Sequence, residues 1–407
     1  MSAVMLLNTV LFFVLLNIGL FIFFQVKDII RSNSSSKVKE NVIKSKSSGL
    51  INKWGMQVFK LTYPRLSEKE IVDLLDETWS RPYLYEPFTQ FKERPYHGKY
   101  VNVSEHGFRV SKNQGPWPPK QSNLNIFLFG GSTTFGYGIT DDQTIASHLQ
   151  EYLSNKLNRG VSVYNFGRGY YYSTQERILL EQLLTSGYVP DLAIFIDGIN
   201  DFYLNTNEPM WTVRFEEYVI GDEERKLRNV RQKIKTFTSR WPISRAIRGI
   251  NRRLNSSHVN RINTNAQSES EKRKTGKNLI DEEVITKKVI KNYLENKKVI
   301  ESLTASYNVQ PVFVWQPVPN FKYDDSNHLF AFGDPRGPMH TIYGYGYMEE
   351  YIKANPLGEN FLWCADIQQE LQEPLYVDPY HYSSKLSKML AVTIADLMMA
   401  RKLLDHQ

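Results

Sequence analysis

The stretch Asn125-Ile126-Phe127-Leu128-Phe129-Gly130-Gly131-Ser132-Thr133 joins a mainly apolar run to a glycine pair and two hydroxyl side chains. A short apolar run of this kind, ended by glycine, predicts a buried strand. The two glycines allow a sharp turn, so we expect the hydroxyl of Ser132 to lie exposed at the end of that strand. The alternative is that Ser132 only caps a following helix, a position that serine favours.

The chain after this strand alternates between strand and helix patterns. Strands are predicted at 161–166, 192–196 and 312–315, and helices at 144–157, 174–185, 284–307 and 385–403. Such alternation predicts an α/β fold, in which helices cover both faces of a parallel sheet. Ligands of these folds bind beyond the carboxyl ends of the strands.

Three segments precede this core. Residues 3–24 are almost wholly apolar, and 22 residues can cross a hydrocarbon core of ~30 Å, so we expect a transmembrane anchor at 1–25. A cleaved signal peptide is the alternative, but a basic n-region and a small-residue cleavage site are missing. Residues 26–50, rich in Ser, Lys and Asn, are expected to be a flexible linker. Residues 51–120, with a predicted helix at 67–79, are expected to be an N-terminal subdomain.

Length and composition restrict the class of protein. The chain has 407 residues, of which 41% are hydrophobic, which is typical of a folded protein with a sizeable core. Its single cysteine, Cys364, excludes an intramolecular disulfide framework and a cysteine-based zinc site.

Positive charge is concentrated in one segment. Residues 225–277 contain sixteen Lys and Arg and two acidic residues, whereas the whole chain has a net charge of +7. Because this segment is also rich in Ser and Asn, we interpret 208–280 as a basic, partly disordered insertion. It is either a solvated surface or a contact for anionic lipid headgroups or an acidic polymer. Nucleic acid is not expected as a partner, because no recognition module accompanies the charge.

A second string, Asp378-Pro379-Tyr380-His381-Tyr382-Ser383, opens the last predicted helix. Asp378 and His381 leave one turn three residues apart, so the carboxylate can orient the imidazole. An imidazole held in this way can take the proton of a serine hydroxyl such as that of Ser132. The alternative is ordinary turn chemistry of the Asp-Pro pair.

A third string, Gly198-Ile199-Asn200-Asp201, follows the predicted strand at 192–196. The amide of Asn200 could donate to a developing oxyanion beside the backbone N–H of Ser132. A further donor could come from the loop that begins at Gly167, after the strand at 161–166. The alternative for Asn200 is a loop residue that satisfies its own backbone.

Taken in the order Ser132, glycine loop, Asn200 and Asp378-x-x-His381, the chain resembles the SGNH (GDSL-type) hydrolases over residues 123–403. The resemblance implies a three-layer α/β/α sandwich of flavodoxin-like type, with the catalytic domain at 121–407. It also implies that Ser132 is the nucleophile of a triad with Asp378 and His381, and that no metal or cofactor is needed.

The resemblance further implies an oxyanion hole made of Ser132, Asn200 and a main-chain N–H of Gly169 or Tyr170. Two positions depart from the family pattern. Gly131 stands where Asp is common, a variant that also occurs in relatives resembling carbohydrate esterases and acyltransferases. Tyr170 stands where similar sequences often have glycine.

Together these patterns favour a membrane-anchored serine esterase that acts through an acyl-enzyme, on O-acyl groups of a carbohydrate or on lipid esters. The aromatic segment 317–370 is expected to wall the substrate site, or to serve ordinary packing. An O-acyltransferase that modifies a cell-envelope glycan is the first alternative, and a catalytically silent binding protein is the second. Lys and Arg after the anchor favour a cytoplasmic catalytic domain. The family resemblance favours the outer side, so the sequence leaves both orientations open.

Overall fold

The computed structural model describes residues 46–203, 267–330 and 341–405, with residues 5, 7–9, 11, 12 and 16 near the N-terminus. The chain divides into two compact units, Met1–Val42 with Glu208–Leu279, and Ile43–Asn207 with Ile280–Gln407. Most of the predicted anchor, linker and basic insertion lies outside the described residues. Within the described ranges, no helix is both long enough and apolar enough to cross a membrane.

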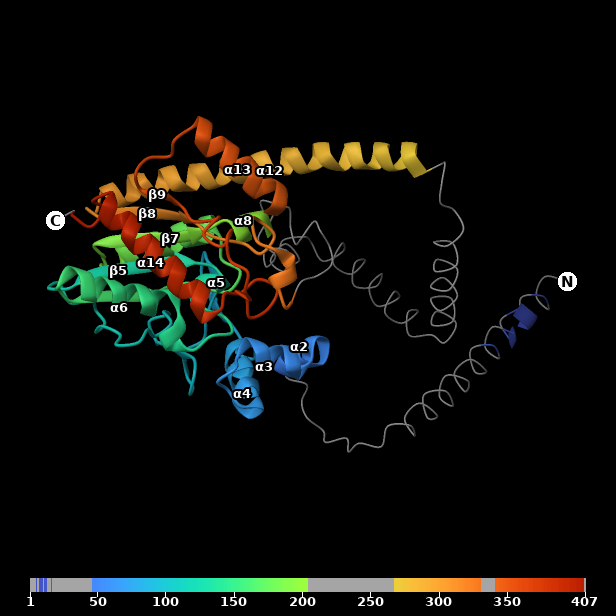
Figure 1. Cartoon of the computed structure of the whole chain (residues 1–407), viewed down its shortest axis with the longest axis horizontal. Coiled ribbons are helices and arrows are strands. Elements are labelled where there is room, and N and C mark those ends of the chain that lie inside the picture. Colours follow the sequence, from blue (N-terminus) through green and yellow to red (C-terminus); the bar gives the residue numbers. More distant parts are fainter. Residues whose placement is uncertain are drawn as a thin grey trace. The chain divides into compact units, whose positions relative to one another are not determined.

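The second unit is built on a five-stranded sheet whose neighbouring strands are all parallel (Figure 1). Its strand order is β6-β5-β7-β8-β9. The bounds are β5 (Leu124–Gly130), β6 (Val161–Asn165), β7 (Leu192–Asp197), β8 (Gln310–Trp315) and β9 (Phe361–Trp363). The parallel sheet and its four predicted strands are confirmed, and β9 is an additional edge strand.

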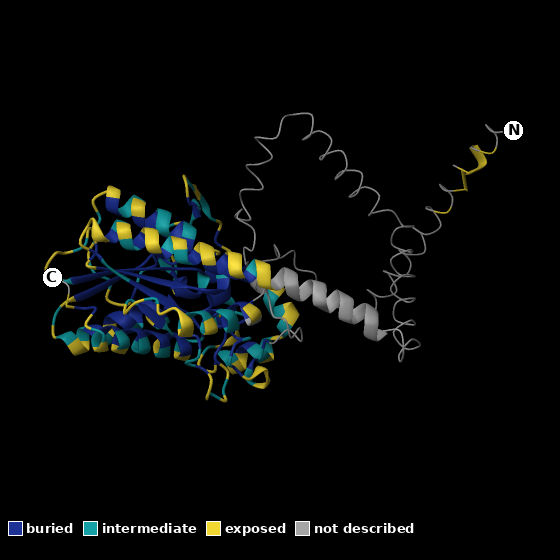
Figure 2. Ribbon diagram, turned by 90° about the horizontal axis from the view of Figure 1, so that it is seen from above, coloured by how far each residue is buried: buried dark blue, intermediate teal, exposed yellow. Residues whose placement is uncertain are grey.

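Helices cover both faces of this sheet (Figures 1 and 2). On one face lie α6 (Ile145–Leu157) and α14 (Ser384–Ala400), and on the other lie α7 (Ser173–Thr185), α12 (Gln267–Ala305) and α13 (Thr341–Ala354). The three-layer prediction therefore matches this arrangement. Helix α12 begins well before the predicted residue 284, because its first residues are mostly Glu, Lys, Gln and other residues that a helix accepts readily.

The two sheet faces have different chemistry because strand side chains alternate. Aliphatic residues such as Ile126, Ile194 and Val312 pack against α6 and α14 in one buried cluster. Phenylalanine rings fill the opposite face: Phe129 stacks on Phe195 with ring centroids 4.9 Å apart. The row continues to Phe166 on one side and Phe313 on the other, at 5.8 and 5.5 Å.

The N-terminal part of this unit packs against the core that contains the sheet. It contains α2 (Lys46–Trp54), α3 (Met56–Thr62), α4 (Glu68–Trp79) and the short strands β1 (Leu84–Glu86), β2 (Gln90–Lys92), β3 (Tyr96–His97) and β4 (Asn102–Val103). The predicted start of α4 is confirmed, since Ser67 and Glu70 form a capping box. Helix α2 begins within the range predicted to be a linker. Phe59 and Leu74 share a buried cluster with core residue Tyr137.

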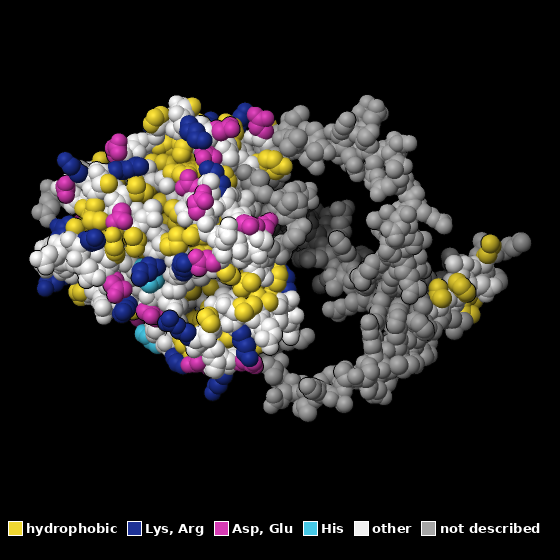
Figure 3. Space-filling view, in the orientation of Figure 1, with side chains coloured by type: hydrophobic (Ala, Val, Ile, Leu, Met, Phe, Trp, Pro, Cys, Tyr) yellow, Lys and Arg dark blue, Asp and Glu magenta, His cyan; other side chains and the backbone are white. Residues whose placement is uncertain are grey.

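Charges of both signs are mixed on one face of this unit. On the face drawn in Figure 3, Lys and Arg side chains lie among Asp and Glu side chains. The basic excess of the sequence comes from residues 225–277. Most of these residues lie outside the described ranges.

The strand order places a crevice between β5 and β7. The chain passes from β5 to β6 on one side and then returns past β5 to β7 on the other, as in flavodoxin-like sheets. The connections therefore leave in opposite directions from these two strands. Gly130 at the end of β5 is paired with Ile196 of β7, so Ser132 and Asn200 both follow the same edge of the sheet.

Candidate active site

Three of the predicted residues form one chain of hydrogen bonds. The Ser132 hydroxyl lies 2.8 Å from Nε2 of His381, and Nδ1 of His381 lies 2.6 Å from Oδ2 of Asp378. Asp378 and His381 are buried, whereas Ser132 is partly exposed. Since a carboxylate only accepts, Nδ1 carries the proton and Nε2 accepts from the serine.

The turn that carries Asp378 and His381 is closed by backbone bonds. The N–H of Val377 donates to the carbonyl of His381 at 2.9 Å. Oδ1 of Asp378 accepts the N–H groups of Tyr380 and His381 at 2.8 and 2.9 Å. Burial raises the pKa of Asp378, but the imidazole of His381 and these hydrogen bonds outweigh it, so the pKa lies below its ordinary value. Asp378 is therefore ionised at neutral pH.

The serine stands at the start of a very short helix, α5 (Ser132–Phe135), directly after β5. Gly131 is the residue that caps this helix, so the capping alternative for Ser132 is wrong. A β-carbon at Gly131 would lie 2.2 Å from Nδ2 of Asn200, so a side chain there would require the amide to shift. The glycine therefore lets the amide of Asn200 approach the serine turn.

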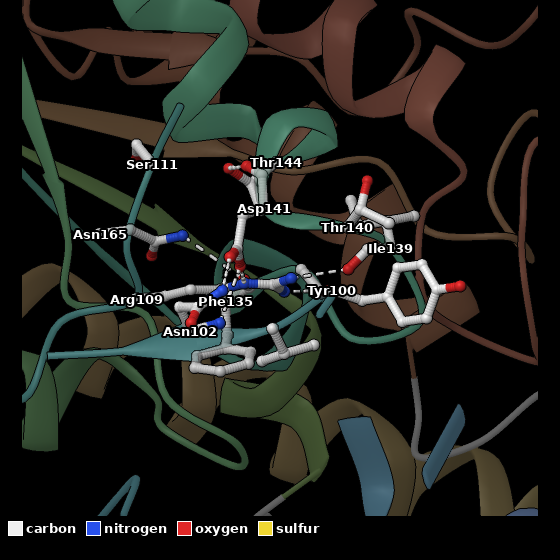
Figure 4. Close-up of polar contacts among 12 residues, drawn as sticks. Tyr100, Asn102, Arg109, Ser111, Phe135, Ile139, Thr140, Asp141, Thr144 and Asn165 are labelled. Atoms are coloured by element: carbon white, nitrogen blue, oxygen red, sulfur yellow. Dashed lines mark hydrogen bonds and ion pairs between the residues drawn. The ribbon is translucent and has the colours of Figure 1, made fainter. Parts of the chain in front are cut away.

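Arg109 holds the far end of this serine helix (Figure 4). Its guanidinium is fully buried and donates to the carbonyls of Phe135, Gly136 and Ile139 at 2.9, 2.5 and 2.6 Å. Nε pairs with Asp141 at 2.9 Å. A cation at carbonyls of a helix C-terminus is favourable, and here it fixes the turn that presents Ser132.

Asn200 lies at the start of α8 (Ile199–Tyr203), after β7. Its Nδ2 donates to the carbonyl of Tyr171 at 2.6 Å, so the amide is tied to the glycine loop rather than to its own backbone. An amide nitrogen carries two protons, and the second can donate to an oxyanion at Ser132. The backbone N–H of Ser132 belongs to the first turn of α5 and has no partner within that helix.

The two candidate donors of the glycine loop, the N–H groups of Gly169 and Tyr170, differ in their surroundings. The N–H of Gly169 donates to Oε1 of Glu93 at 3.2 Å, so it already has an acceptor within the protein. Tyr170 has φ of 66°, in the left-handed region that favours glycine. This conformation explains why glycine is common at that position in similar sequences.

A cavity of about 270 Å³ opens beside the serine and is lined by Ser132, His381 and Asn200. Its aromatic lining is Trp54, Trp79, Tyr83, Tyr137, Tyr170 and Tyr380. The prediction that 317–370 wall the site is wrong for the described part of that segment, none of which lines the cavity. Those aromatic residues pack elsewhere, as Tyr345 does against Trp315 at 5.5 Å.

These contacts assemble at the sheet edge between β5 and β7. The site is a Ser-His-Asp triad, as the sequence resemblance implied. It brings together Ser132, Asp378, His381 and Asn200, with Gly169 and Tyr170 in the adjoining loop.

Comparisons with known proteins give only distant similarities. No protein-family model and no curated protein matches the chain. Similar solved structures include a lipase from a goat rumen metagenome, with 10% identity, a TM-score of 0.38, and coverage of 68% of this chain and 97% of that one. A member of the lipolytic G-D-S-L family from Veillonella parvula has 10% identity, a TM-score of 0.34, and coverage of 68% and 98%. An esterase from Pseudoalteromonas has 12% identity, a TM-score of 0.32, and coverage of 68% and 98%. At these values the assignment rests on the site's own residues.

Three buried carboxyl groups lie close to one another near the Asn200 helix, and sequence reasoning assigned them no role. Glu176, Asp197 and Asp201 are 1, 2 and 6% exposed. Burial and mutual repulsion raise the pKa of Glu176 and Asp197 well above the usual range. Burial raises the pKa of Asp201 to about 6, against hydrogen bonds from Ser173 and the N–H of Gly198. Among the described residues, no such group is arranged to hold a metal ion.

Sequence reasoning also missed Arg109 and Glu93. Both lie far from the triad along the chain, and neither stands in a motif. Two acids of the carboxyl cluster, Asp197 and Asp201, did flank Asn200 in the sequence. Two acidic residues this close together, the first at the end of a buried strand, were the available signal.

Asp201→Asn should change stability in a pH-dependent way. A carboxyl whose folded pKa is raised binds its proton more tightly when folded, so it stabilises the fold below pH ~4 and loses that effect as the pH rises through about 6. From pH 4 to 8 this amounts to about 2 kcal/mol of unfolding free energy. Urea unfolding at several pH values should show Asp201→Asn gaining stability relative to the wild type as the pH rises. An exposed control, Asp405→Asn, should not, and a difference independent of pH would contradict the assignment.

Proposed function

We propose that this chain is an SGNH-type serine ester hydrolase that acts through an acyl-enzyme. The observation that carries the proposal is the unbroken hydrogen-bond chain from Asp378 through His381 to Ser132. That chain ends at the wall of a cavity large enough for a small ligand group. Such an arrangement activates a hydroxyl that is otherwise a weak nucleophile.

The first half of the reaction follows from the proton positions. Oγ of Ser132 attacks the ester carbonyl carbon while Nε2 of His381 takes the hydroxyl proton, and Asp378 stabilises the imidazolium. The carbonyl oxygen becomes an oxyanion, which Asn200 Nδ2 and the Ser132 N–H stabilise. Since Gly169 is turned toward Glu93, we assign the third N–H to Tyr170. Collapse of the intermediate breaks the ester bond, and the imidazolium returns its proton to the leaving alcohol.

The second half regenerates the serine. A hydroxyl donor gives its proton to His381 and attacks the acyl carbon. The carbon–Oγ bond then breaks, and the imidazolium returns its proton to Oγ of Ser132. Water as the donor gives hydrolysis, whereas a sugar hydroxyl gives transfer to a glycan. We propose hydrolysis. Transfer is kept as the alternative because both reactions start from the same acyl-enzyme.

The cavity supports two classes of ester. Its aromatic faces suit either an acyl chain or the ring of an O-acylated carbohydrate. A catalytically silent binding protein is disfavoured, because nucleophile, base and carboxylate are all present and hydrogen-bonded.

Ser132→Ala should abolish turnover of p-nitrophenyl acetate, with a loss on the order of 10⁶ in kcat. An exposed serine at the end of α7 provides the control, and Ser186→Ala should behave as the wild type. Retained activity in Ser132→Ala would refute the nucleophile. Adding a glycan acceptor to the wild type tests the alternative, since release of p-nitrophenol only in its presence would indicate transfer.

Asn200→Ala should lower kcat by roughly 10²- to 10³-fold with little change in KM, because its amide acts on charge that develops in the transition state. The exposed Asn355, which follows α13 and donates to the carbonyl of Tyr351 in that helix, provides the control Asn355→Ala. A loss below about threefold would remove Asn200 from the oxyanion hole.

We further propose that residues 1–25 anchor the protein in a membrane, supported by the almost wholly apolar stretch of 22 residues from 3 to 24. Deleting 1–25 should move the protein from an alkali-washed membrane fraction to the supernatant. Unchanged sedimentation would contradict the anchor. In the deleted form, residual binding to anionic vesicles should weaken when 225–277 is also removed, if that basic segment contacts lipid headgroups.

A further inference from the structure

One buried carboxylate outside the triad contacts both the glycine loop and Tyr137. Glu93 follows β2 and is 2% exposed. Its Oε1 accepts the hydroxyl proton of Tyr137 at 2.8 Å and the N–H of Gly169 at 3.2 Å. Its Oε2 forms an ion pair with the buried guanidinium of Arg81 at 3.1 Å. The carboxylate therefore joins the glycine loop to Tyr137 through a single oxygen.

Tyr137 in turn packs against the catalytic base, His381. Its ring stacks on the imidazole of His381, with centroids 5.4 Å apart and planes inclined by 25°. Trp79 meets the same imidazole edge-on, at 5.1 Å and 75°. The imidazole is thus held by two aromatic rings in addition to its bonds to Asp378 and Ser132, and Glu93 holds one of those rings.

The hydrogen-bond direction in this network follows from the groups present. A carboxylate only accepts, so Tyr137 donates to Glu93 and its oxygen then accepts from the Tyr83 hydroxyl, 2.8 Å away. Burial and the charge of Glu93 raise the pKa of both tyrosines, so both keep their protons. A β-carbon at Gly169 would lie 2.2 Å from the Tyr83 hydroxyl, which brings the glycine loop against the same network.

We propose that Glu93 is a positioning residue that fixes His381, through Tyr137, and the oxyanion loop, through Gly169, in one geometry. The proposal rests on the proposed function. Glu93 touches no reacting atom and acts only through these two neighbours. Misplacing a reacting group by about 1 Å can cost on the order of 10²-fold in rate, so a carboxylate that sets two such groups together has a large effect on turnover.

The test uses the full-length chain, p-nitrophenyl acetate hydrolysis and the rate at which a fluorophosphonate labels Ser132. Glu93→Gln should keep KM within about twofold, and should lower kcat and the labelling rate about 10- to 100-fold. Tyr137→Phe keeps the ring on His381 but removes the hydroxyl link, and should lower kcat about 3- to 10-fold. The double variant should lose no more than Glu93→Gln alone, because both changes break one network.

Glu77→Gln is the matched control. Glu77 lies in α4 and accepts the backbone N–H groups of Lys99, Tyr100 and Val101 at 3.0, 2.7 and 2.9 Å, with a purely structural result. It should lower the melting temperature and leave kcat and the labelling rate of the folded protein unchanged. Melting curves show which variants fold.

The outcomes separate the two proposals. If wild-type Ser132 neither reacts with the fluorophosphonate nor turns over ester, the proposed function fails. If the wild type reacts and folded Glu93→Gln matches it within twofold, the role of Glu93 is overturned while the function stands. If Glu93→Gln does not fold, because Arg81 is left buried without its partner, Tyr137→Phe decides, and wild-type kinetics in that variant overturn the role.

Discussion

The close contact between the serine turn and the Asn200 amide is the constraint on which the site depends. Two neighbouring parallel strands, β5 and β7, deliver these groups to one edge of the sheet. In this chain Gly131 allows the close approach, since a β-carbon there would lie 2.2 Å from the amide nitrogen and the amide would have to shift. The strand order opens the crevice at this edge, and the hydrogen bonds of the triad then join it to the turn before α14.

Much of this arrangement could be predicted from the sequence because its parts are local. The strand before Ser132, the turn that carries Asp378 and His381, and the capping box at Ser67 each lie within a few consecutive residues. Their joining in space followed from a general property, that parallel strands end at a common edge. The roles assigned to Ser132, Asp378, His381 and Asn200 stay predictions until activity is measured, although the structure places these side chains together.

The rest could not be predicted because it depends on contacts between distant segments. Arg109 binds carbonyls some thirty residues later, and Glu93 joins Arg81, Tyr137 and Gly169 from three parts of the chain. Burial of such groups leaves no periodic pattern in the sequence: Glu93 stands between two charged residues, Lys92 and Arg94, and looks like an exposed loop residue. The cavity wall shows the same effect: aromatic residues of 317–370 were expected there, but among the described residues Trp54 of α2, Trp79 of α4 and tyrosines from several loops supply it.

The left-handed backbone of Tyr170 is strained, and the same residue helps to shape the cavity. A non-glycine residue in this conformation costs about 1–2 kcal/mol relative to its ordinary backbone, and the ring of Tyr170 is part of the cavity wall. A search for more heat-resistant forms of this chain would therefore be drawn to glycine at this position. The gain in thermal stability would come with a wider cavity opening and with lower selectivity among the molecules that enter it.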